Sequence, residues 1–227
     1  MQKKILFVMP SSTNEPVITG GISILSGVAK KCMWDVELFD SYQYDTAKVN
    51  KESYFQAKEM TGEIMPLKGG RKGDTLLPFE ELVIDLQDKI NIFEPSIIAV
   101  SFTSYEYGIF LSFWKKIKVP LSTLIICGGY HAVIAPDEVI SSKLFSMVVI
   151  GEGEEVVKEI LNAYEHGKDL SKIDGTFFYD KIRTQICRNQ RKELIDKTRL
   201  WQCIPDDSLY LHEQKYFLIP SFNGKTC

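Results

Sequence analysis

The feature of this sequence that most constrains its fold is an alternation of short apolar runs with segments of helical periodicity. The apolar runs are rich in Val, Ile, Leu and Phe, which is typical of strands buried on both faces of a parallel sheet. Successive parallel strands need a crossover connection, and a helix supplies it in right-handed βαβ units. The pattern predicts an α/β fold with a doubly wound, five-stranded parallel sheet that is Rossmann-like and has the flavodoxin-type strand order.

The alternation can be followed along the first three quarters of the chain. The expected strands are Lys4–Met9, Asp35–Asp40, Ser96–Phe102, Thr123–Gly129 and a run within Met147–Gly153. The expected helices are Gly21–Lys31, Pro78–Phe93, Tyr105–Ile117, Pro136–Ser142 and Glu154–Gly167. After Gly167 the pattern changes, and residues 175–189 read as an antiparallel β-hairpin. We therefore divide the chain into residues 1–167 and a small C-terminal extension, residues 168–227.

Ligands of open α/β sheets bind beyond the carboxyl ends of the strands, so the residues that follow each strand are candidates for a site. They share small size, a hydroxyl group or an acid: Ser11, Ser12, Thr103, Ser104, Tyr105, Gly128, Gly129, Tyr130, His131, Gly151, Glu152, Gly153 and Glu154. Glycines allow a bulky, mostly neutral ligand to approach the backbone closely. The set holds neither a nucleophile–base pair nor a cluster of metal ligands, so we predict a binding site with no catalytic residue and no metal.

The residues after the strands also disfavour two functions that are common for this fold, a receiver domain and a dinucleotide-binding site. A receiver domain needs acids after the first strand, an Asp after the third and a Lys after the fifth, and none is present. A dinucleotide site needs GxGxxG after the first strand, whereas the GEGEE run follows the fifth and lacks the third glycine. A flavodoxin-like site for FMN needs a hydroxyl-rich phosphate loop after the first strand. The segment "PSSTNEP" matches that pattern weakly, so a flavin-binding module stays an alternative, as does a ligand-free protein interaction domain.

Charge and composition restrict the partners. The formal net charge of -3 gives no electrostatic case for nucleic acid. No apolar run approaches the ~20 residues that cross a bilayer, so we expect no membrane partner. The five cysteines form no CxxC pair, which agrees with reduced thiols and predicts a cytoplasmic protein.

Three segments of the sequence together resemble a known family. They are "CGGYHAVIAPDEV" from Cys127, "FSMVVIGEGEEVVKEIL" from Phe145 and "DLSKIDGTFF" from Asp169. This combination of GG-x-H and GEGE resembles the N-terminal cobalamin-binding domain of cobalamin-dependent radical S-adenosylmethionine enzymes, over most of residues 3–178. The resemblance implies that cobalamin lies on the carboxyl edge with its nucleotide tail reaching into the sheet. The residues named above become cofactor-binding candidates, His131 is expected at the nucleotide tail, and Gly129 and Gly153 are expected to serve the cofactor rather than the fold.

The sequence also departs from the family pattern. The family continues into a barrel whose CxxxCxxC motif holds a [4Fe-4S] cluster and which uses S-adenosylmethionine, whereas this sequence ends at "SFNGKTC" with Cys227 near the first cluster position. We therefore expect residues 1–167 to be the cobalamin-binding domain and residues 168–227 to be a hairpin and linker. The linker would lead toward a radical S-adenosylmethionine barrel, the expected partner, in a longer, methyltransferase-like parent chain. Residues 10–21 carry no DxHxxG motif, so no protein imidazole is expected on cobalt.

Overall fold

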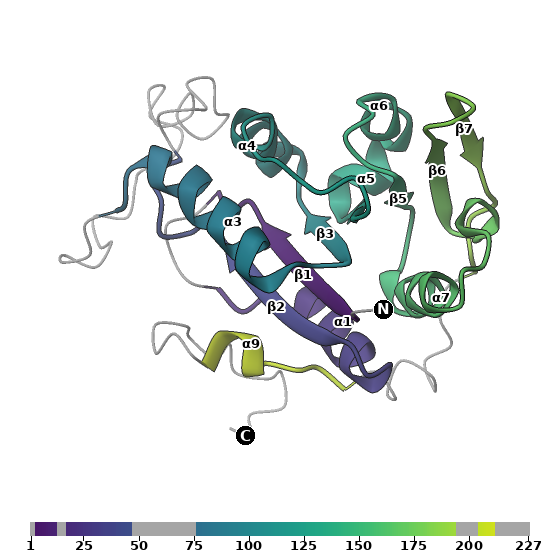
Figure 1. Ribbon diagram of the computed structural model, residues 1–227, viewed down its shortest axis with the longest axis horizontal. Helices are drawn as coiled ribbons and strands as arrows, with labels where there is room; N and C mark the ends of the chain where they lie inside the picture. Colours follow the sequence, from purple (N-terminus) through teal and green to yellow (C-terminus); the bar gives the residue numbers. More distant parts are fainter. Residues whose placement is uncertain (1–2, 13–16, 47–75, 194–203, 212–227) are drawn as a thin grey trace, which may run out of the picture.

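The computed structural model describes residues 3–12, 17–46, 76–193 and 204–211. Within them a single mixed sheet has the strand order β2-β1-β3-β4-β5-β6-β7 (Figure 1). The strands are β1 (Lys4–Met9), β2 (Asp35–Asp40), β3 (Ile97–Ser101), β4 (Leu124–Gly128), β5 (Met147–Val149), β6 (Thr176–Asp180) and β7 (Gln185–Arg188). Strands β1 to β5 are parallel, and their order is the predicted one.

The predicted size of the sheet is wrong, because the hairpin joins it. Strand β6 pairs antiparallel with β5, with Met147 opposite Phe178, and β7 pairs antiparallel with β6. The sheet is therefore mixed and seven-stranded among the described residues. An uncovered β5 would leave a row of unpaired N–H and C=O groups at the edge, and the hairpin satisfies them. The division of the chain at Gly167 stays a prediction.

Alternating side chains of the parallel strands feed two separate apolar cores. Residues such as Leu6, Val8 and Val100 pack against one group of helices, and Ile5, Phe7 and Ala99 pack against another. The first group is α3 (Phe79–Phe93), α4 (Ser104–Trp114), α5 (Tyr130–Ile134) and α6 (Pro136–Ser141), and the second is α1 (Gly20–Lys31) and α7 (Gly153–Glu165). Because successive strand residues point to opposite faces, both faces of the sheet are buried. No helix among the described residues is long and apolar enough to cross a membrane.

Residues 204–211 return to the first part of the chain, where α9 (Ser208–Leu211) lies beside β2 and α1 (Figure 1). The amide of Asp206 donates to the carbonyl oxygen of Ser23 in α1 at 2.8 Å. The carbonyl oxygen of Ile204 lies 2.0 Å from where a Cβ on Gly27 would stand, so only glycine permits this approach. A short 3-10 helix, η1 (Leu170–Lys172), connects α7 to the hairpin.

Candidate functional site

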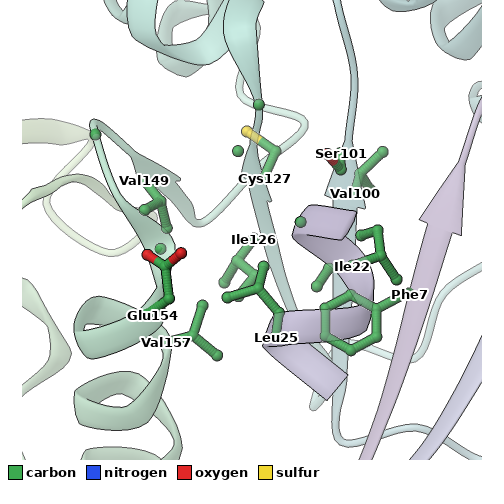
Figure 2. Close-up of a pocket in the computed structure, with 16 residues that line it drawn as sticks. Phe7, Ile22, Leu25, Val100, Ser101, Ile126, Cys127, Val149, Glu154 and Val157 are labelled. Atoms are coloured by element: carbon green, nitrogen blue, oxygen red, sulfur yellow. The ribbon is translucent and has the colours of Figure 1, made fainter. Parts of the chain in front are cut away.

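A cavity of about 160 Å³ opens at the carboxyl ends of the parallel strands, between the sheet and helices α1 and α7 (Figure 2). Its lining is mostly apolar side chains and glycines: Phe7, Gly21, Ile22, Leu25, Ala99, Val100, Ser101, Ile126, Cys127, Gly128, Gly129, Val149, Gly151, Gly153, Glu154 and Val157. This is the edge at which ligands of open α/β sheets bind.

Small residues at matched positions create the space. Ser101 at the end of β3 lies in register with Gly128 at the end of β4. A Cβ on Gly21, at the start of α1, would meet no atom within 4 Å beyond its own helix backbone, and a Cβ on Gly128 would meet only Val149 at 3.8 Å. The two strand ends and the start of α1 therefore leave room for a ligand against their backbones.

The GEGEE run begins the wall formed by α7. Gly151 has φ +120°, a conformation that side chains rarely adopt, and it turns the chain from β5 toward the helix. A Cβ on Gly153 would lie 3.2 Å from Leu25 Cδ2, so this glycine lets α7 approach α1. Glu152 is the exposed N-cap residue of α7, and Glu155 points to Lys192, with Nζ and Oε2 3.9 Å apart.

Glu154 differs from these neighbouring acids because it faces the cavity. Its Oε2 atom is buried and has no hydrogen-bond partner among the described residues. Figure 2 shows its carboxylate on the α7 side of the cavity, with Ser101 on the opposite side and Ile126 and Cys127 between them. Burial raises the pKa of the Cys127 thiol well above its ordinary value, so this sulfur lines the cavity as a neutral group.

The other side of the carboxyl edge, next to α4 and α5, is occupied by hydrogen bonds within the protein. Thr103 and Glu106 form a capping box at the start of α4, in which the Thr103 amide donates to Glu106 Oε2 at 2.8 Å. His131 Nδ1 lies 3.0 Å from Ser104 Oγ, and the imidazole is buried and packs on the ring of Tyr107, with centroids 4.6 Å apart. Its Nε2 atom is buried, makes no hydrogen bond within the described residues and lies 3.9 Å from Glu138 Oε1. These contacts serve to fix α4 and α5.

The segment after β1 is likewise held by the protein. Ser11 donates through Oγ to Asp40 Oδ1 at 2.7 Å, and its amide donates to Ser41 Oγ at 2.8 Å. Ser12 donates to Glu106 Oε1 at 3.3 Å.

The structure brings together only part of the residues predicted for the site. Gly128, Gly129, Gly151, Gly153 and Glu154 line the cavity. The remaining candidates are not among the lining residues: Ser11, Ser12, Thr103, Ser104, Tyr105, Tyr130, His131 and Glu152. Tyr130 is 77% exposed at the start of α5. His131, which was expected at the nucleotide tail, contacts α4 and α6 instead.

Gly129 has a packing role that the sequence did not indicate. Its φ of +96° and ψ of -178° belong to a region that is essentially restricted to glycine. A Cβ at this position would lie 2.6 Å from the carbonyl oxygen of Phe102. Gly129 is therefore required by the fold, contrary to expectation, and its contact with the cofactor stays a prediction.

Sequence reasoning missed the apolar part of the lining. Phe7, Ala99, Ile126 and Val149 are strand residues that point to the α1 and α7 face, and they were expected only as core. The pair Gly20–Gly21 was the available signal, because two adjacent glycines leave the backbone at the start of a helix open to close approach. Within the described residues, no group of three or more His, Cys, Asp or Glu is arranged to hold a metal ion.

Comparisons with known proteins find similarity in fold but not in sequence. No protein-family model matches the chain, and no curated protein matches it in sequence. Among solved structures, the chain is similar to a cobalamin-dependent S-adenosylmethionine radical enzyme, OxsB, with aqua-cobalamin and S-adenosylmethionine bound. The identity is 13% and the TM-score 0.59, over 93% of this chain and 25% of that chain.

A second similar structure is the radical S-adenosylmethionine methyltransferase TsrM from Kitasatospora setae, with cobalamin and a [4Fe-4S] cluster bound. The identity is again 13%, with a TM-score of 0.55, over 87% of this chain and 30% of that chain. The chain thus spans about a quarter to a third of the length of the structures it matches. At this identity the likeness establishes a shared α/β fold.

Proposed function

We propose that this chain is the cobalamin-binding module of a radical S-adenosylmethionine enzyme with a methyltransferase-like parent chain. The observation that carries the proposal is the cavity lined by glycines at the carboxyl edge, between α1 and α7. The solved structures of similar fold, which have cobalamin bound, support it. The [4Fe-4S] cluster and S-adenosylmethionine would belong to the radical barrel, the partner region of the longer parent.

The size and the apolar lining of the cavity fit the nucleotide end of a corrinoid of the cobalamin type. A corrin ring is far larger than a cavity of about 160 Å³, whereas a nucleotide base has a suitable size. The floor formed by Phe7, Ile126 and Val149 is apolar, as a buried planar base requires. Glu154 Oε2, a buried acceptor without a partner among the described residues, supplies a position for a donor of the ligand.

The chain's own residues would bind, orient and shield the cofactor. Gly128, Gly151 and Gly153 would let it approach the backbone, and Ser101 and Glu154 would hydrogen-bond its polar atoms. Ile22, Leu25 and Val157 would exclude water from the buried end. When bound, cobalamin supplies a cobalt centre that can carry a methyl group. Apart from binding, this chain would need the rest of the parent to perform a reaction.

The flavin alternative has weaker support. A flavin mononucleotide needs donors for its phosphate after β1, but Ser11 uses both its hydroxyl and its amide within the protein. A ligand-free interaction domain would not need the matched small residues that form the cavity.

Titration of the purified chain with aquacobalamin, followed by visible absorbance, tests the proposal. We expect saturable one-to-one binding, loss of that binding in Gly128→Val, and no binding of FMN. The Gly128→Val variant places methyl groups in the cavity while its Cβ makes only an ordinary contact, so its thermal unfolding should match that of the wild type. Quenching of FMN fluorescence without cobalamin binding would support the flavin alternative, and binding of neither would contradict both cofactor proposals.

A further inference from the structure

We infer that Glu154 makes the cavity selective for a nucleotide base with an exocyclic amine, of the adenine type, over a base without an N–H donor, such as dimethylbenzimidazole. The inference rests on the proposed function and deepens it, because it names the class of corrinoid that the module takes.

Glu154 places an acidic group inside the cavity. Glu154 is the only residue with a charged side chain among those that line the cavity, and its Oε2 is buried without a partner within the described part of the chain. Most buried polar atoms in proteins have a hydrogen-bond partner, so an orphan acceptor needs an explanation. An ionised carboxylate can only accept hydrogen bonds. A ligand that presents a donor at this position would satisfy it.

The bases of different corrinoids differ in whether they can donate a hydrogen bond to such a group. Once joined to ribose, dimethylbenzimidazole has no N–H group and two methyl groups, so beside Glu154 it would leave the carboxylate desolvated and unpaired. Adenine has an amino group with two N–H donors beside ring nitrogens that accept. The Ser101 hydroxyl, which can donate, lies on the opposite side of the cavity from Glu154 (Figure 2). Glu154 can thus accept from the amino group at one end of an adenine base while Ser101 donates to a ring nitrogen on the far side of the base, and the apolar residues between them match its faces.

Glu154 faces the cavity, whereas the acid next to it in the sequence does not. Glu155 is in the same first turn of α7 but points to Lys192 and does not line the cavity. Glu155→Leu is therefore a matched control, with the same change of charge and size one residue away. Among the described residues that line the cavity there is no Lys or Arg to receive a free phosphate, so a free adenine nucleotide is disfavoured relative to an adenine-base corrinoid.

The experiment measures dissociation constants of the full chain for adeninylcobamide, cobalamin and adenosine monophosphate by titration calorimetry. We expect adeninylcobamide to bind at least about tenfold more tightly than cobalamin, in line with a hydrogen bond to a charged group, and adenosine monophosphate not to bind. Glu154→Leu should abolish the preference by weakening adeninylcobamide binding alone, and Glu155→Leu should retain it.

Each other result overturns the inference. Equal wild-type affinity for the two corrinoids, or a preference for cobalamin, would do so even if no variant could be folded. A preference that survives in Glu154→Leu would place selectivity elsewhere. An equal loss for both corrinoids in Glu154→Leu would mean that Glu154 accepts from the shared ribose. Binding of adenosine monophosphate alone would point to a free nucleotide site, and binding of no corrinoid would overturn the proposed function together with this inference.

Discussion

The two sides of the carboxyl edge carry similar residues in sequence and use them in different ways. Beside α4 and α5, most polar groups are bonded to one another: the Thr103 hydroxyl accepts from the Glu106 amide, and Ser104 lies within hydrogen-bond distance of His131 Nδ1. The buried Nε2 of His131 makes no hydrogen bond within the described residues, but it lies 3.9 Å from Glu138 Oε1. Beside α1 and α7, glycines and small side chains leave a cavity, and the buried Oε2 of Glu154 has no partner in the described part of the chain. Polar groups that satisfy each other stabilise a fold, whereas space next to an unsatisfied acceptor favours a ligand. We assign binding to the second side and structure to the first.

The largest effect should come from the two adjacent glycines of the cavity lining, because a Cβ on Gly129 would clash with Phe102 and a Cβ on Gly128 would not. Gly129→Val should lower the free energy of unfolding by about 3 kcal/mol or more, because it combines a strained backbone with overpacking against Phe102. Gly128→Val should leave the unfolding free energy within about 1 kcal/mol, since its Cβ makes only an ordinary contact. Urea denaturation of both variants checks this. A Gly129→Val protein as stable as the wild type would contradict the packing role of Gly129.

Replacement of His131 tests whether the α4 and α5 side of the carboxyl edge serves the fold and not the ligand. His131→Ala should cost about 2 kcal/mol of stability, because it removes a buried ring that packs on Tyr107 and bonds Ser104. Cobalamin affinity should change by less than about twofold, since the side chain does not line the cavity.

Electron paramagnetic resonance of the Co(II) complex gives His131 an independent readout. The imidazole faces α4 and α6, so we expect no nitrogen triplet splitting of the cobalt lines in the wild type and an unchanged spectrum in His131→Ala. Triplets that disappear in the variant would assign His131 to the metal and reverse the division.

Replacement of Asp206 tests whether its contacts with Ser26 and Lys30 stabilise α1 on the side away from the cavity. Burial alone would raise the pKa of Asp206, but hydrogen bonds from Lys30, Ser208 and Ser26 outweigh it and lower the pKa from 3.8 to about 2. Because the folded-state pKa is lower than the unfolded one, the ionised group stabilises the fold above about pH 4, and this contribution is lost as the pH falls toward 2.

Asp206→Asn should therefore cost about 1 kcal/mol near neutral pH, a value reduced for partial solvent screening, and almost nothing at pH 2. Cobalamin affinity should stay within about threefold of the wild type, because Asp206 does not line the cavity. Denaturation curves at pH 7, 4 and 2 measure the stability difference. A difference that is constant over this range would contradict the assignment of the carboxylate.

The sequence predicted the parallel part of the fold well because periodicity is a local property. The runs Lys4–Met9 and Asp35–Asp40 have the predicted bounds, and Gly167 closes the last long helix at positive φ. The sequence did not predict that the hairpin would extend the sheet, because the pairing of Met147 with Phe178 depends on tertiary contacts. Helix α5 and residues 204–211 were also missed, since neither segment is long enough to show a period.

The candidate site was harder to predict because its key property is space. Glycines and hydroxyls at strand ends can be read from a sequence, but whether they face a cavity cannot. Gly128 and Gly129 are neighbours with different roles, and the difference lies in one backbone angle and one contact with Phe102. Likewise, of the acids in GEGEE, only Glu154 lines the cavity.

Hydrogen exchange of backbone amides, with and without saturating aquacobalamin, tests the central claim most directly. We expect exchange to slow at the start of α1 around Gly21, at the end of β4 around Gly128, and in residues 149–157, which form the cavity. Exchange in α4 and α6, on the other side of the edge, should stay unchanged. Slowing confined to α4 and α6, or saturable binding without any slowing around the cavity, would contradict the assignment of the ligand to the α1 and α7 side.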